Sequence, residues 1–283
     1  MQDMPLENAY RYCEQMVRSH YENFPVASWF LPKHIRRPVS VIYAFARTAD
    51  DLADEGTDPA EQRLQQLTAY GRQLDAIHNS DDPIFIALAH VMQRHQLPMQ
   101  LFHDLLTAFK MDVTQKRYGS FNELLFYCRH SANPVGQLLV HLNGCVSADN
   151  LRYADNICTA LQLINFYQDL AQDYQENNRI YIPLDEMQQY AVTEQHFTTL
   201  RSDQAMQDLM AFQIQRARSM LLSGRQLGTI LAGRMGFELR MVIAGGLRIC
   251  DKLIHNKGNV FARPRLNKTD WPGIIWQATK RTY

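Results

Sequence analysis

The chain of 283 residues lacks a surplus of charge, a paired cysteine motif and any long apolar run. Lys and Arg total 29, and so do Asp and Glu, so the basic excess expected of a general nucleic-acid binder is missing. The five cysteines are scattered, with no CxxC motif and no metal-ligand spacing. No segment approaches the roughly 18 uninterrupted apolar residues that a membrane-spanning helix needs. We therefore expect no nucleic-acid partner and no membrane span.

The first residues also lack the basic and apolar segments of a secretory signal. Together with an odd number of cysteines, this predicts a reduced, cytoplasmic protein. Hydrophobic residues make up 46% and charged residues 20%, which is typical of a folded globular chain. No linker, low-complexity tract or internal repeat divides the sequence, so we expect a single domain over residues 1–283.

Glycine and proline are few, 13 and 11, and they lie mostly between segments with helical apolar periodicity. Alternating β-branched runs are hard to find, so the sequence predicts an all-α fold. Pro38 should precede a helix, and Ser120 and Glu123 should form a capping box. Helices are expected at about 6–21, 39–55, 60–78, 83–95, 98–113, 121–144, 148–174, 184–198, 202–228 and 232–256.

One predicted helix carries a cluster of charge. Tyr43, Arg47, Asp50, Asp51 and Asp54 fall on one stripe, at offsets of three, four and seven residues. Neighbouring carboxylates repel one another. A purely structural helix would avoid this cluster unless cations compensate for it.

A second polar stripe interrupts an otherwise apolar helix. It consists of Gln162, Asn165, Asp169 and Asp173. A polar stripe on a core-like helix needs a polar partner, and cations shared by the two stripes would supply one. A few hard oxygen ligands on rigid helices suit Mg²⁺, which takes the rest of its shell from water and phosphate. The residues thus favour a diphosphate held through Mg²⁺ between two helices over two solvated acidic faces.

At these residues the chain resembles the squalene/phytoene synthase family, the head-to-head prenyl synthases. The resemblance covers about residues 8–260. It rests on YxFxRxxDDxxD at 43–54, NxxxDxxxD at 165–173 and RIYIP at 179–183. Together these motifs are specific.

Within that family the chain looks most like the bacterial hydroxysqualene synthases of hopanoid pathways. The segments ENFPVAS at 22–28 and SANPVG at 131–136 carry this closer resemblance, as does the pair Gln168-Asp169. Relatives that condense two prenyl diphosphates have arginine in place of Gln168, and several have tyrosine in place of Arg248. The absence of an arginine beside the diphosphate site is consistent with a substrate that carries only one diphosphate group.

The resemblance implies an all-helical bundle of the isoprenoid synthase type around a deep, mostly apolar cavity. It implies Mg²⁺ as the cofactor, and no NADPH. The implied metal ligands are Asp50, Asp54, Asp169 and Asp173. The implied substrate-binding residues are Asn23, Phe24, Arg47, Gln162, Asn165, Arg179 and Tyr181. The expected catalytic residues are Tyr43, Arg47, Tyr127, Gln168 and Arg248.

The implied reaction converts presqualene diphosphate and water to hydroxysqualene and diphosphate. Mg²⁺ and Arg47 would assist departure of the diphosphate, the carbocation would rearrange, and water would capture it. One alternative is an enzyme that condenses two prenyl diphosphates to presqualene diphosphate, squalene or phytoene. Another is a non-catalytic helical assembly factor. Tyr43 and Tyr127 are also compatible with plain packing, and His130 with a structural role rather than that of a base.

The last segment, 257–283, differs from the rest of the chain. It has six Lys or Arg residues against one acidic residue, and it contains Trp271 and Trp276. This composition suits an anionic membrane surface, where a C30 lipid product would be released. The alternative is that the tail packs back on the bundle. Contact with neighbouring hopanoid-pathway enzymes is a further expectation.

Overall fold

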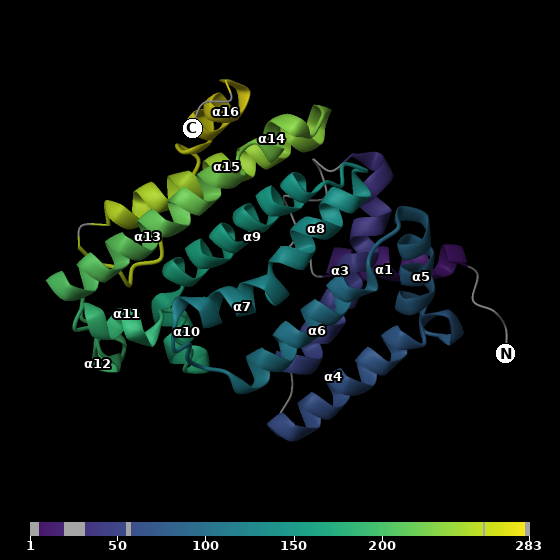
Figure 1. The fold of residues 1–283 in the computed structure, drawn as a ribbon, viewed down its shortest axis with the longest axis horizontal. Coiled ribbons are helices and arrows are strands. Elements are labelled where there is room, and N and C mark those ends of the chain that lie inside the picture. Colours follow the sequence, from purple (N-terminus) through teal and green to yellow (C-terminus); the bar gives the residue numbers. More distant parts are fainter. Residues whose placement is uncertain (1–5, 20–31, 55–57, 257, 281–283) are drawn as a thin grey trace. The chain divides into compact units, whose positions relative to one another are not determined.

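The computed structural model describes residues 6–19, 32–54, 58–256 and 258–280, and no strand occurs among them (Figure 1). The all-α prediction is therefore confirmed. The helices are α1 Leu6–Ser19, α3 Lys33–Asp54, α4 Ala60–Asp75, the 3₁₀ helix η2 Ile77–Asn79, α5 Pro83–His95, α6 Met99–Thr114, α7 Phe121–Ser131, α8 Asn133–Leu142, α9 Ala148–Gln168, α10 Leu170–Asn177, α11 Leu184–Gln189, α12 Glu194–Thr198, α13 Gln204–Gly224, α14 Leu227–Ile230, α15 Gly233–Ile254 and α16 Trp271–Lys280.

The chain divides into two compact units. The first comprises residues 1–114 and 137–147, and the second comprises residues 115–136 and 148–283. In the first unit α3 packs against α1, α4, α5 and α6. Phe45 of α3 is fully buried there and contacts the ring of Tyr70, with centroids 5.1 Å apart. Phe45 is thus a core residue.

In the second unit α9 and α13 lie side by side, and α15 packs on both (Figure 1). The apolar stripe of α13 is buried as its spacing predicts; it consists of Met206, Met210, Ile214, Ala217 and Leu221. Gly224 lets α13 approach α9 closely. A Cβ at that position would lie 2.5 Å from the carbonyl oxygen of Tyr153.

Pro38 does not precede a helix but lies inside one, so the expected start at residue 39 is wrong. Helix α3 begins at Lys33, which places Pro38 in its second turn. A proline there removes one backbone donor, the one that would bond to the carbonyl of His34. Residues 33–37 are mostly charged and have no apolar periodicity, so the sequence pattern does not indicate that the helix begins there.

Several helices expected from the sequence are broken, among them two in the region of the predicted site. The segment 121–144 forms α7 and α8 with a break at Ala132, and the segment 148–174 forms α9 and α10 with a break at Asp169. Asp169 has φ −104° and ψ 14°, which depart from helical dihedral angles. Apolar periodicity continues across both breaks, so it does not reveal them.

The start of α7 departs from the expected capping box in one detail. The hydroxyl of Ser120 accepts from the backbone N–H of Glu123 at 3.4 Å, as expected. The carboxylate of Glu123, however, accepts from the N–H of Gly119 at 2.7 Å. The second half of the box is thus displaced by one residue.

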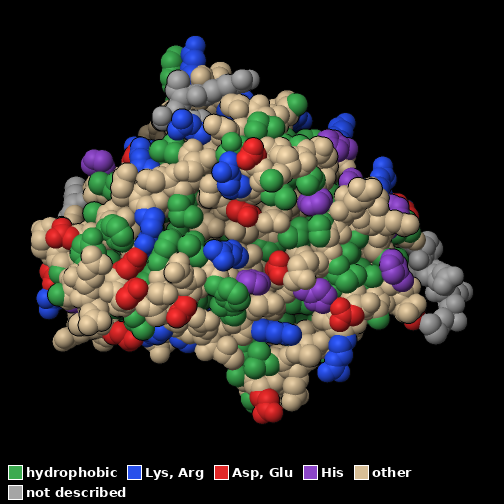
Figure 2. Space-filling model, in the orientation of Figure 1, with side chains coloured by type: hydrophobic (Ala, Val, Ile, Leu, Met, Phe, Trp, Pro, Cys, Tyr) green, Lys and Arg blue, Asp and Glu red, His purple; other side chains and the backbone are tan. Residues whose placement is uncertain are grey.

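In the described part of the chain, no helix is both long and apolar enough to cross a membrane. All five cysteines lie within that part, and each is a free thiol. Figure 2 shows basic and acidic side chains interspersed over the face that it draws, in keeping with the balanced composition.

Candidate active site

The first aspartate motif lies on the last three turns of α3, in the first unit. The guanidinium of Arg47 pairs with two carboxylates of its own helix, at 2.6 Å to Asp51 Oδ1 and 3.2 Å to Asp50 Oδ2. Asp54 is exposed at the end of the helix. Arg47 thus supplies part of the compensating charge that the cluster requires.

Tyr43 lies one turn before Arg47 and is partly buried. Burial raises the pKa of its hydroxyl, the negative charges of Asp50 and Asp51 raise it further, and Arg47 opposes them. The hydroxyl therefore stays protonated at neutral pH and remains a hydrogen-bond donor.

The second aspartate motif lies at the junction of α9 and α10, in the second unit. The carbonyl of Asn165 accepts from the N–H of Asp169 at 3.0 Å, and the carbonyl of Asp169 accepts from the N–H of Asp173 at 2.8 Å. Gln162 is partly buried and Asn165 is exposed on α9. The main chain thus holds Asp169 and Asp173 one turn apart, as the spacing predicts.

Asp173 has an unusual electrostatic environment. Burial, followed by the negative charge of Asp169, raises the pKa of its carboxyl to about 7. The positive charges of Arg179 and Arg263 oppose this rise. A divalent cation would relieve the same repulsion, so the pair has the chemistry of a cation site.

Arg263 is a residue of this site that sequence reasoning missed. Its Nη2 donates to Asp169 Oδ2 at 3.0 Å, and its Nε pairs with Oδ1 of the same carboxylate. Beside it, the amide of Gln168 donates to the carbonyl oxygen of Pro264 at 2.7 Å. The basic tail therefore lies against the second aspartate motif. Nothing in the local sequence signals this, because 94 residues separate the partners.

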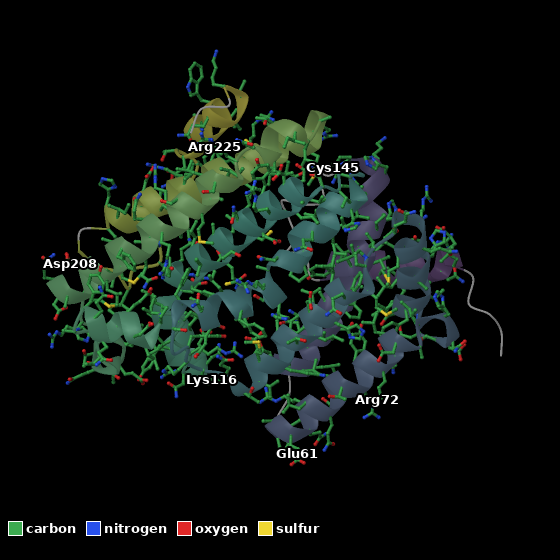
Figure 3. All side chains as sticks on the ribbon, in the orientation of Figure 1. Glu61, Arg72, Lys116, Cys145, Asp208 and Arg225 are labelled. Carbon is green, nitrogen blue, oxygen red and sulfur yellow. The ribbon has the colours of Figure 1, made fainter. Side chains whose placement is uncertain are left out.

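Arg117, also not anticipated, holds the turn that follows α10. Its guanidinium donates to the side-chain oxygen of Asn178 at 2.9 Å and pairs with Glu194 at 2.8 Å. Asn178 has φ 50°, a left-handed conformation that asparagine tolerates. The residues after Asn178 therefore run beside the segment that contains Lys116, which is labelled in Figure 3. The carbonyl of Lys116 accepts a hydrogen bond from the N–H of Ile180 at 3.0 Å.

That turn places Arg179 and Tyr181, both buried, next to the second motif in the chain. The N–H of Arg179 donates to the carbonyl of Asp173 at 3.0 Å. The ring of Tyr181 stacks on Phe166, with centroids 3.6 Å apart and planes 4° from parallel. Tyr127 joins this cluster, 5.8 Å from Tyr181. The structure thus brings two predicted site tyrosines together.

Arg248 is exposed on α15, and its guanidinium pairs with Asp270 at 2.7 Å. Asp270 is 4% exposed and also accepts from Lys252 and from the N–H of Asn267. Arg248 also lines an open polar hollow of about 380 Å³ together with His255. Its predicted catalytic role stays a prediction, and what the structure shows is a residue that anchors the tail.

Asn23 and Phe24, predicted to bind substrate, lie outside the described residues. The remaining predicted site residues form two groups, one in each unit. The first unit holds Tyr43, Arg47, Asp50 and Asp54. The second unit holds Tyr127, Gln162, Asn165, Gln168, Asp169, Asp173, Arg179, Tyr181 and Arg248.

The donor atoms of the aspartate pairs fit Mg²⁺. They are hard carboxylate oxygens, and Asp169 Oδ1 is buried against the guanidinium of Arg263. Among the described residues, no three His, Cys, Asp or Glu side chains gather closely enough to hold a metal by themselves. Mg²⁺ takes few protein ligands and completes its shell with water and phosphate oxygens.

The helical architecture and the paired aspartate motifs define the class as an all-helical isoprenoid synthase. The solved squalene synthase HpnC from Alicyclobacillus acidocaldarius has the same fold, with a TM-score of 0.83 and 32% identity over 90% of this chain and 97% of that one. A dehydrosqualene synthase solved with a ligand, at 22% identity, matches in fold with a TM-score of 0.79, covering 98% of this chain and 97% of that one.

The chain belongs to the squalene/phytoene synthase family, whose family model matches residues 17–271. It is 35% identical to the phytoene synthase of Mycobacterium tuberculosis over 66% of this chain and 61% of that protein, so the match spans less than two thirds of that relative. It is 33% identical to the hydroxysqualene synthase of Rhodopseudomonas palustris over 81% of this chain and 78% of that protein. The family resemblance stated from the sequence motifs is thereby confirmed.

Proposed function

We propose that this protein converts presqualene diphosphate and water to hydroxysqualene and diphosphate. The observation that carries the proposal is Gln168, an uncharged amide beside Asp169 where two-substrate relatives are expected to have arginine. Similarity to hydroxysqualene synthases from Rhodopseudomonas palustris and Sinorhizobium fredii, at 33% and 31% identity, supports it.

The reaction needs no reductant. The bond between carbon and diphosphate oxygen breaks, the cyclopropylcarbinyl cation rearranges to an open allylic cation, and water forms the new carbon–oxygen bond and loses a proton. Each aspartate pair, Asp50 with Asp54 and Asp169 with Asp173, would hold Mg²⁺. When bound, Mg²⁺ supplies positive charge that stabilises the leaving diphosphate.

The chain's own residues contribute in three ways. The charge of Arg47 is partly neutralised by Asp50 and Asp51 of its own helix, and its guanidinium donates hydrogen bonds to diphosphate oxygens. The hydroxyl of Tyr43, which stays protonated, donates another hydrogen bond. The ring of Tyr127 would stabilise a cationic intermediate, and Tyr181, stacked on Phe166, would support that ring. Substrate contacts from Gln162, Asn165 and Arg179 belong to the same proposal.

Gln168 has a defined role in this proposal. Its amide N–H₂ donates to the carbonyl of Pro264, so its oxygen is the atom oriented to accept from a water. A water that donates to this oxygen keeps a lone pair for the carbocation. Arg248 acts indirectly, because it holds Asp270 and with it the tail that orients Gln168.

The test is incubation of the purified protein with presqualene diphosphate and Mg²⁺, without NADPH, followed by product identification. Hydroxysqualene as the main product supports the proposal. In Gln168→Arg, the hydroxysqualene share should fall and that of other products of the trapped cation should rise. An unchanged rate and product spectrum would show that Gln168 has no role in water capture.

One observation favours the rival activity, condensation of two prenyl diphosphates. Arg263 of the tail places a guanidinium beside Asp169. It thus supplies near the second motif the positive charge that Gln168 lacks. Similarity to a phytoene synthase at 35% identity points the same way. Incubation with farnesyl diphosphate alone discriminates, because only a condensing enzyme consumes it.

A non-catalytic assembly factor would have no need of four intact aspartates. A thermal shift measured with Mg²⁺ and inorganic diphosphate tests this class. A rise in Tm that requires both components supports an enzyme, whereas no shift favours the assembly factor.

We further propose that the enzyme works at a membrane surface in the cytoplasm, where its lipid product can leave, beside enzymes that consume the product. The tail supports this proposal. Helix α16 buries Ile274 and Ala278, while Trp271 and Trp276 are exposed.

A further inference from the structure

Two adjacent contacts hold the basic tail against the second aspartate motif. Arg263 forms a two-point ion pair with the carboxylate of Asp169, and the next residue, Pro264, accepts a hydrogen bond from Gln168. Residues 263–264 thus lie against residues 168–169, the pair at the break between α9 and α10. The contact covers the carboxylate that the proposed function assigns to Mg²⁺.

The tail is anchored on both sides of Arg263 by contacts that do not involve it. On one side, the N–H of Val260 donates to the hydroxyl of Ser202 at 3.1 Å. On the other side, buried Asp270 binds Arg248 and Lys252 of α15. The side chain of Arg263 itself is 41% exposed. The guanidinium can therefore leave Asp169 while the tail stays in place.

A carboxylate cannot give the same oxygens to a guanidinium and to a metal ion at full strength. The ion pair engages both oxygens of Asp169, so a cation that binds there competes with Arg263 for them. The displaced guanidinium, anchored close by, has the planar fork that matches two phosphate oxygens.

We infer that Arg263 is an exchangeable counter-ion at this site: it occupies Asp169 in the metal-free protein and binds the diphosphate once Mg²⁺ takes the carboxylate. This inference rests on the proposed assignment of Asp169 as a metal ligand. It adds a diphosphate-binding residue from the tail, and it makes metal and diphosphate binding cooperative, because metal binding at Asp169 would release the arginine for the diphosphate.

The test compares Arg263→Gln with Arg263→Lys, and with Arg225→Gln as a matched control. Arg225 is an exposed arginine of the same unit, labelled in Figure 3 at the end of α13. Calorimetric titration with MgCl₂ alone measures the competition, and titration of Mg²⁺-saturated protein with inorganic diphosphate measures the second role. Circular dichroism establishes that each variant is folded.

Arg263→Gln should bind Mg²⁺ alone about two- to fivefold more tightly, since a partly exposed ion pair no longer competes. It should bind diphosphate about tenfold more weakly, since a charge-assisted pair of hydrogen bonds is lost. Arg263→Lys should lie between, and Arg225→Gln should match the wild type. A purely structural clamp would instead lower the Tm and leave both affinities unchanged, which overturns the inference.

Failure of the proposed function would look different. A wild-type protein that makes no hydroxysqualene, yet shows opposite changes in Mg²⁺ and diphosphate affinity in Arg263→Gln, keeps the inference and loses the reaction. A wild-type protein that binds neither probe overturns the exchange itself.

Discussion

Asp169 and Asp173 show how one helical turn places two carboxylates where a bound cation would relieve their repulsion. Their spacing brings like charges together, and burial raises the pKa of Asp173 to about 7. Arg179 and Arg263 offset only part of this cost. A pair that is unfavourable by itself becomes favourable when a divalent cation binds, which is the physical basis for the predicted roles.

Asp50→Asn, Asp54→Asn, Asp169→Asn and Asp173→Asn should each lower turnover by about 100-fold or more, because each weakens a metal that stabilises the leaving group. The fold should survive, since none of the four side chains is fully buried. Steady-state rates at limiting Mg²⁺, with circular dichroism as the control, provide the measurement. Near-wild-type rates in one variant from each motif would remove the metal-site assignment.

Glu238 is a second carboxylate with a raised pKa, distant in sequence from both motifs. It is 8% exposed on α15, and burial raises its pKa from 4.5 to about 7. The folded state therefore binds a proton that the unfolded state has lost. The free energy of unfolding should fall as the pH rises through this window, and the cost should be fully present above pH 7.

Glu238→Gln removes that cost because the amide carries no charge. Above pH 7 the variant should be more stable than the wild type by about 1–3 kcal/mol, and near pH 4.5 the two should be similar. Guanidinium unfolding at pH 5 and pH 8 measures the difference. An equal difference in the free energy of unfolding at both pH values would show that the substitution acts through side-chain shape and not through charge.

Helix packing in the second unit depends on small residues at close crossings. Gly224 lies where α13 meets α9, and a Cβ there would also lie 2.5 Å from Ile157 Cγ1. The nearby carbonyl of Tyr153 belongs to a helix backbone and cannot rotate away. The approach of these two helices therefore requires glycine for space, and not for a special backbone conformation.

Gly224→Ala should destabilise the protein by about 1–3 kcal/mol, the usual cost of overpacking a core. Gly273→Ala on α16 is the control, because a Cβ there meets nothing within 4 Å. Alanine also favours helix, so the control should be neutral or slightly more stable. Chemical unfolding measures the free energy of unfolding of both variants. Equal values would mean that α13 can move to accommodate the added methyl group.

On the scale of the whole molecule, the charge of the tail is more one-sided than its composition indicates. Its one acidic residue, Asp270, is buried and paired with Arg248 and Lys252. The exposed charges that remain are basic, among them Lys280, which lies 5.1 Å from the ring of Trp276. At the upper edge of Figure 2, over α16, hydrophobic and basic side chains lie together.

Trp271→Ser combined with Trp276→Ser should reduce partitioning to vesicles that contain anionic lipid by about fivefold or more, because α16 loses most of its exposed aromatic area. Trp276 is 63% exposed and Trp271 is 39% exposed. Tyr12→Ser, at an exposed aromatic residue of α1, is the control. Unchanged vesicle sedimentation would exclude this helix as the contact. Deletion of the tail is less informative, since it also removes Asp270.

The amino-acid sequence by itself determined the helical class, the buried stripe of α13 and the two aspartate motifs, because these depend on local periodicity and on spacing within one helix. The break at Asp169 could not be predicted, since apolar periodicity runs through it. Only the tertiary structure brought Arg263 to Asp169 and Arg248 to Asp270. These pairs join residues far apart in the chain, and a one-dimensional pattern carries no information about which distant charge will neutralise which carboxylate.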